Sequence, residues 1–114
     1  HAALHPKVNA PGRGGTVYGM CKAALERFTT GLAAEASNDK IGVNVISPGL
    51  VATPGVLHHK LVNESNKDMA TPVEHMAEAC LHLVHGDPSV NSGHITYAAD
   101  VLKNFSLTPA ELLA

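Results

Sequence analysis

The sequence predicts an α/β protein, and two stretches of the chain carry that prediction. Over residues 16–37, apolar residues recur at the three- to four-residue spacing of an amphipathic helix. Residues 41–46 are short, rich in β-branched side chains and bounded by turn residues, which favours a strand buried on both faces. A helix followed by a buried strand is half of the unit from which helix-covered parallel sheets are built.

The composition limits both the size of the fold and its partners. With 114 residues, 45% of them hydrophobic, the chain can form one domain or part of one, but not two. The formal net charge is -2 and the basic residues are scattered, so we expect no nucleic-acid partner. No apolar run approaches the roughly 20 residues that span a bilayer, and the first residues lack a signal-peptide pattern. We therefore expect no membrane partner and a cytoplasmic location.

The first part of the chain is predicted to hold a loop and one long helix. Residues 1–15 contain Pro6, Pro11 and several glycines, which disfavour helix and ladder hydrogen bonding and predict a loop. The helix over 16–37 has an apolar side made of Val17, Cys21, Ala24, Leu25, Phe28 and Leu32. Since Cys21 lies on that side, we expect its thiol to pack in the core.

The rest of the chain is predicted to continue the alternation. After the strand over 41–46, residues 50–71 form a mixed, polar segment with a short helix at 56–62. A second short strand is expected over 93–97.

A further helix, over 72–85, is predicted from its start and stop signals. Thr71 is placed as the N-cap, Pro72 at the first helical position and Glu74 at the capping-box position. Gly86 ends the helix.

Tyr18 and Lys22 form the pair that points to chemistry. They are four residues apart near the start of the first helix, so both side chains lie on one face, one turn apart. A free phenol titrates near pH 10, and a neighbouring ammonium favours its deprotonated form. A tyrosine in that position can act as a general acid or base.

Three ordered features resemble the short-chain dehydrogenase/reductase family. They are the Tyr18 and Lys22 pair on a helix, the Pro48-Gly49 turn after a buried strand, and Thr53 four positions beyond Gly49. The resemblance continues through the helix over 72–85 and covers nearly the whole chain. It implies the C-terminal portion of a doubly wound, Rossmann-like parallel sheet whose first half is absent from this sequence.

The resemblance also implies roles for individual residues. Tyr18 would protonate a substrate carbonyl or deprotonate an alcohol, and Lys22 would activate it and hydrogen-bond the nicotinamide ribose. Residues 50–71 would cover a small alcohol or carbonyl substrate. The cofactor would be NAD or NADP, with the preference open, and the protein a homo-oligomer. The residues implied in cofactor binding are Tyr18, Lys22, Pro48, Gly49, Val51 and Thr53.

The sequence departs from the family pattern at three points. It lacks the glycine-rich strand-turn-helix that binds pyrophosphate. His5 occupies the place where the catalytic serine usually lies, so we expect that serine upstream of His1. Ala98-Ala99-Asp100 replaces the usual Asp-Gly-Gly ending. A truncated dehydrogenase that serves as a non-enzymatic oligomerisation or interaction module is therefore the alternative.

Other candidate sites are disfavoured. The glycines at 12–15 precede a helix but follow no predicted strand, so they do not make a phosphate site. His75, Glu78, His82 and His85 share one predicted helix stripe, whereas zinc ligands normally converge from several elements. We therefore expect no metal.

Overall fold

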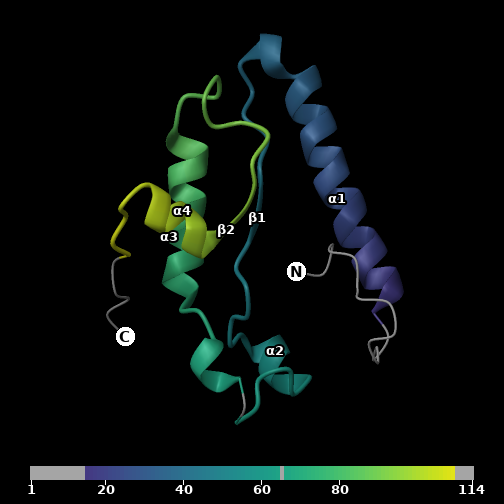
Figure 1. Ribbon diagram of the computed structural model, residues 1–114, viewed down its shortest axis with the longest axis vertical. Coiled ribbons are helices and arrows are strands. Elements are labelled where there is room, and N and C mark those ends of the chain that lie inside the picture. Colours follow the sequence, from purple (N-terminus) through teal and green to yellow (C-terminus); the bar gives the residue numbers. More distant parts are fainter. Residues whose placement is uncertain (1–14, 65, 110–114) are drawn as a thin grey trace. The chain divides into compact units, whose positions relative to one another are not determined.

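The computed structural model describes residues 15–64 and 66–109 (Figure 1). The chain divides into two units. The first unit comprises His1–Val45 and Pro88–Ile95, and the second comprises Ile46–Asp87 and Thr96–Ala114. Each unit is described on its own. The predicted loop over 1–15, except Gly15, and the position of His5 lie outside the described residues.

Helix α1 (Thr16–Glu35) is the main element of the first unit. It starts after Gly15, whose φ of 86° lies in the left-handed region that favours glycine. The predicted helix over 16–37 is two residues longer than α1, because Ser37–Asp39 tightens into the 3-10 helix η1. Lys40, with φ 57°, then ends the helical run.

The side of α1 that packs within its unit is the one with small residues. Thr29, Ala33 and Ala36 are buried, and a Cβ placed on Gly93 would lie 3.7 Å from the Ala33 Cβ. Four large apolar side chains of α1 are exposed, namely Val17, Met20, Leu25 and Phe28, whereas Leu32 is half-buried. Cys21 is exposed as well, so the expected burial of its thiol is wrong for this chain. The segment around Gly93 packs on the small-residue face of α1 and leaves most of the predicted apolar side uncovered.

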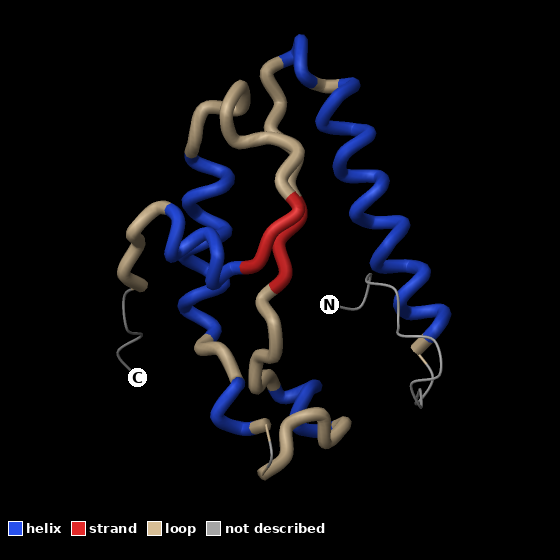
Figure 2. The backbone as a smooth tube through the Cα atoms, in the orientation of Figure 1, coloured by secondary structure: helices blue, strands red, loops and turns tan. Residues whose placement is uncertain are grey.

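The strands β1 (Val45–Ser47) and β2 (Ile95–Tyr97) pair in a two-stranded parallel sheet, drawn red in Figure 2. The Val45 amide donates to the His94 carbonyl at 2.9 Å. Together with the helices, this sheet confirms the predicted α/β class and a partial Rossmann-like fold.

Both strands are shorter than the predicted ranges 41–46 and 93–97, because side chains replace part of the ladder. The Asn44 Nδ2 donates to the Asn91 carbonyl at 2.9 Å, and its Oδ1 accepts from the His94 amide at 3.1 Å. Gly93 adopts φ 78°, which is incompatible with extended strand geometry. β1 is half-buried, whereas the sequence predicted burial on both faces. Within the described residues it pairs with one strand, β2.

The core of the second unit lies between helices α3 (Val73–His85) and α4 (Ala98–Asn104). Helix α4 was not among the predicted elements. It supplies three of the five members of the buried cluster, which consists of Ala79, Leu83, Ala98, Val101 and Leu102. No helix in the described part of the chain is both long and apolar enough to cross a membrane.

The start of α3 corrects one prediction. Pro72, not Thr71, is the N-cap residue, and no side chain caps the helix. The Thr71 amide instead donates to the Leu50 carbonyl at 2.6 Å, which ties this residue to the preceding loop. Glu74 remains in the first turn of α3, where a negative charge is favourable for the helix dipole.

Candidate active site

Tyr18 and Lys22 lie one turn apart on α1. The Lys22 Nζ is 5.2 Å from the centroid of the Tyr18 ring, within the range of a cation-π contact. Tyr18 is 59% exposed, so its hydroxyl can be reached from solvent. Lys22 is half-buried and has no carboxylate partner among the described residues. The helix thus presents an accessible phenol beside an ammonium that no acid neutralises.

The turn after β1 depends on the conformation of Gly49. Its φ of 77° lies in the left-handed region, where a side chain would be strained. Pro48 and Val51 are half-buried. The Val51 carbonyl accepts a hydrogen bond from the Thr53 amide at 2.8 Å. This turn sets the direction in which the chain leaves the strand and enters the next helix.

Thr53 has a structural role that the sequence analysis missed. It is the N-cap of helix α2 (Pro54–His58), and its Oγ1 accepts from the Val56 amide at 3.4 Å. The signal was available in the sequence, since threonine followed by proline is typical of a helix start. The helix begins two residues before the predicted range of 56–62. Because Oγ1 acts here as an acceptor, its own proton remains available for a ligand.

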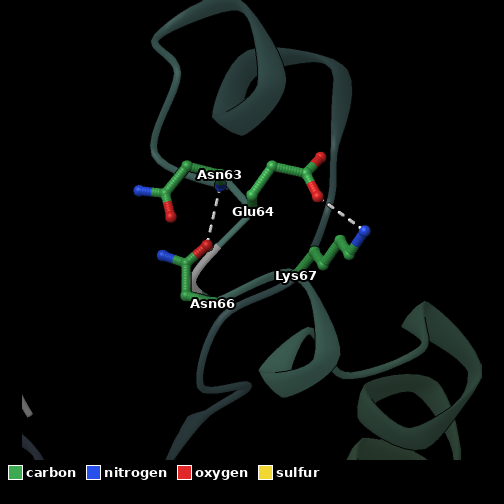
Figure 3. A network of polar contacts seen from close by, with 4 residues as sticks. All are labelled: Asn63, Glu64, Asn66 and Lys67. Carbon is green, nitrogen blue, oxygen red and sulfur yellow. Dashed lines mark hydrogen bonds and ion pairs between the residues drawn. The ribbon is translucent and has the colours of Figure 1, made fainter.

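The remainder of segment 50–71 is organised by local polar contacts (Figure 3). The Asn66 Oδ1 accepts from the Asn63 amide at 2.7 Å, while its Nδ2 donates to the Leu61 carbonyl at 3.0 Å. Lys67 and Glu64 form an ion pair at 2.7 Å. The segment is largely exposed, so its conformation rests on its own turns more than on packing.

The predicted site residues are distributed over the two units. Tyr18 and Lys22 belong to the first, and Pro48, Gly49, Val51 and Thr53 belong to the second. Within each unit, the residues are close neighbours in the chain and form the local arrangements described above.

The histidines on α3 form no metal cluster. No three His, Cys, Asp or Glu side chains within the described ranges are grouped so that they could hold a metal ion. The His82 ring instead packs against Phe105, with ring centroids 4.1 Å apart. Its buried Nε2 has no hydrogen-bond partner in the described part of the chain.

A family model matches this chain over a range that contains both groups of site residues. Residues 4–99 match a family model described as enoyl-(acyl carrier protein) reductase. A tropinone reductase homolog from Arabidopsis thaliana is 34% identical over 67 residues, which cover 57% of this chain and 26% of the relative. The match therefore spans about a quarter of that relative's length. No solved structure matches the chain significantly.

Proposed function

This chain belongs to the short-chain dehydrogenase/reductase family, and we propose that it carries the acid/base part of an NAD(P)-dependent oxidoreductase that interconverts an alcohol and a carbonyl compound. The observation that supports this proposal best is the pairing of Tyr18 and Lys22 on α1, with the ammonium 5.2 Å from the ring centroid. Family membership supports the redox class, and the exposed phenol supports proton transfer as the task of this part of the protein.

In the proposed reaction, Tyr18 moves a proton at one defined atom, its hydroxyl oxygen. During reduction the hydroxyl donates its proton to the substrate carbonyl oxygen, and during oxidation the phenolate takes the proton of the alcohol. Lys22 favours the phenolate through its positive charge.

Each unit carries groups suited to a nicotinamide nucleotide, NAD or NADP. In the first unit, the Lys22 ammonium can donate to ribose hydroxyls. In the second unit, the Thr53 hydroxyl retains a proton for the carboxamide oxygen. Pro48, Gly49 and Val51 would fix the backbone around the nicotinamide. A bound nucleotide would supply or accept the hydride, while the protein sets the geometry and the proton supply.

We also propose the partners and location of the protein. The substrate is a small alcohol or carbonyl compound covered by residues 50–71, consistent with the reductase names of the matched family and relative. The exposed apolar side chains of α1, including Val17 and Phe28, support a homo-oligomer. The proposed location is cytoplasmic. A non-enzymatic interaction module is less well supported, because Tyr18 and Lys22, the residues that proton transfer requires, are both present.

The proposal is tested on the full-length protein that carries this sequence. NADH and NADPH oxidation is followed by absorbance against a panel of aldehydes and ketones, and the reverse reaction is followed against the matching alcohols. We expect turnover that depends on the carbonyl or alcohol with at least one of the two nucleotides. Binding of nucleotide without turnover of any member of a broad panel would favour the non-enzymatic alternative.

A further inference from the structure

An open surface cavity of about 510 Å³ lies in the second unit, where α4 ends. Its lining includes residues from α3, from α4 and from the segment 106–109 that follows. None of these residues belongs to the candidate active site. The cavity therefore has no part in the chemistry proposed above.

Four polar side chains line this cavity. They are His75 on α3, Lys103 near the end of α4, Ser106 and Thr108. None of these side chains makes a hydrogen bond or ion pair with another described residue, and the lining contains no Asp or Glu. A lysine and a histidine with no acid opposite them favour a negatively charged group between them.

The other part of the lining is apolar. Leu102 is 8% exposed and belongs to the core cluster, and Leu107 packs against that cluster. Ala99 and Pro109 complete the apolar lining. A ligand that satisfies both parts therefore needs an anionic head and a hydrocarbon body.

The segment that follows α4 turns back against the helix. Ser106 has φ 52°, a left-handed conformation that is common where a helix ends. The Leu107 amide donates back to the Leu102 carbonyl at 2.9 Å. This turn brings Ser106 and Thr108 to the same cavity as Leu102 and Leu107.

A second cavity, of about 380 Å³ in the first unit, provides a contrast. Three of its hydroxyl groups are already bonded: Thr30 donates to Arg27, Ser37 donates to Ala34, and Ser92 accepts from the Val43 amide. Thr30 and Ser37 already donate their hydroxyl protons, so this cavity offers fewer free hydroxyl donors to a ligand.

We propose that the cavity beside α4 binds an organic anion, a carboxylate or phosphate group carried on an apolar chain. His75 and Lys103 bind the anionic head, and the hydroxyls of Ser106 and Thr108 donate to its oxygens. The hydrocarbon body lies on Leu102 and Leu107. The site is independent of the dehydrogenase chemistry, so its failure would leave the proposed oxidoreductase function unaffected.

The test is calorimetric titration of the full-length protein that carries this sequence with octanoate, octyl phosphate and the neutral analogue octanol. We expect saturable binding of at least one anion and at least tenfold weaker binding of octanol. The double variant His75→Gln/Lys103→Gln should weaken anion binding at least tenfold. The matched control His59→Gln/Lys60→Gln removes the same residue types from an exposed part of the same unit and should change the affinity less than twofold. Circular dichroism of both variants checks that they remain folded.

Several outcomes would overturn the site. These are equal binding of octanol and the anions, equal loss in the two double variants, or no saturable binding of either anion. Glu111, two positions after Pro109, is the nearest acid in the sequence outside the described residues. If anions bind only after Glu111→Gln, the chain's own carboxylate is the occupant and the proposed ligand is wrong. If inorganic phosphate binds as tightly as octyl phosphate, the apolar lining formed by Leu102 and Leu107 has no role in binding.

Discussion

The Lys22 ammonium lies over the face of the Tyr18 ring, 5.2 Å from its centroid. The contact needs only the helical repeat of α1, because residues four apart are neighbours on a helix surface. The ring contact does not involve the phenol hydroxyl, so the hydroxyl and the ring can be tested separately. A substitution that keeps the ring and removes the hydroxyl isolates proton transfer.

Tyr18→Phe in the full-length protein should lower turnover by about 100-fold or more, which is the usual contribution of a general acid or base. Nicotinamide nucleotide affinity should remain nearly unchanged, because the ring and its contact with Lys22 are retained. Steady-state kinetics together with nucleotide titration checks both expectations. The control is Tyr97→Phe, which makes the same chemical change on β2. A Tyr18→Phe variant with more than about a tenth of wild-type activity would exclude Tyr18 as the acid/base residue.

Lys22→Gln should impair both turnover and nucleotide binding, since the proposed ammonium acts on the phenol and on the ribose. We expect about tenfold weaker nucleotide affinity, consistent with the loss of one hydrogen bond from a charged donor. Lys40→Gln, at an exposed position of the same unit, is the matched control. If Lys22→Gln lowers turnover but leaves nucleotide affinity at the wild-type level, the ribose contact is wrong.

Local features were predictable from the sequence, whereas burial was not. The helical spacing of Tyr18 and Lys22 depends on α1 alone, and the family resemblance read from this pair and the Pro48-Gly49 turn is confirmed by the family match. The exposure of Cys21 depends on which segment meets α1, which periodicity cannot specify. Strand ends were also misplaced, because the Asn44 side chain takes over backbone hydrogen bonds beyond β1.

Helix α4 was not predicted because it is stabilised mainly by packing against another helix, α3. The stretch is only seven residues long, too short for a helix that is stable alone. Ala98 and Val101 are buried against α3 in one cluster with Ala79. The packing of α4 on α3 therefore sets the stability of this element and can be tested at a single contact.

Ala79→Leu should destabilise the second unit. Ala79 is 0% exposed, so the larger side chain has no space without displacing α4. Overpacking of this kind costs about 1–3 kcal/mol of unfolding free energy. Ala77→Leu introduces the same side chain at an exposed position of the same helix and should be nearly neutral. The unfolding free energies of both variants are compared by denaturant unfolding. Equal values would mean that α3 and α4 are not closely packed at Ala79.

The 114-residue chain alone should bind NADH and NADPH weakly and show no dehydrogenase turnover. Its sequence contains no glycine-rich turn that follows a strand, the arrangement that holds the pyrophosphate. We expect a dissociation constant above about 100 μM by calorimetry. The full-length protein, titrated in parallel, is the positive control. Micromolar affinity of the isolated chain would mean that residues within it hold most of the nucleotide.

The 114-residue chain alone should also self-associate. Two features favour this: the sheet has only the pair β1 and β2 within the described residues, which leaves strand edges unpaired, and α1 exposes Val17 and Phe28. Unpaired edges and exposed apolar side chains both recruit further chains. The midpoint of thermal unfolding should therefore rise with protein concentration, and sedimentation should detect species larger than a monomer.

A matched pair of variants identifies which surface drives the association. Val17→Lys/Phe28→Lys places two charges on the apolar side of α1 and should shift the sedimentation profile towards the monomer. Leu81→Lys/Val84→Lys makes the same change at exposed positions of α3 and should leave association nearly unchanged. If neither pair changes the profile, the strand edges, whose backbone groups are unaffected by these charges, carry the association. A stable monomer, with a thermal unfolding midpoint that does not depend on protein concentration, would instead show that neither the strand edges nor the α1 surface drives self-association.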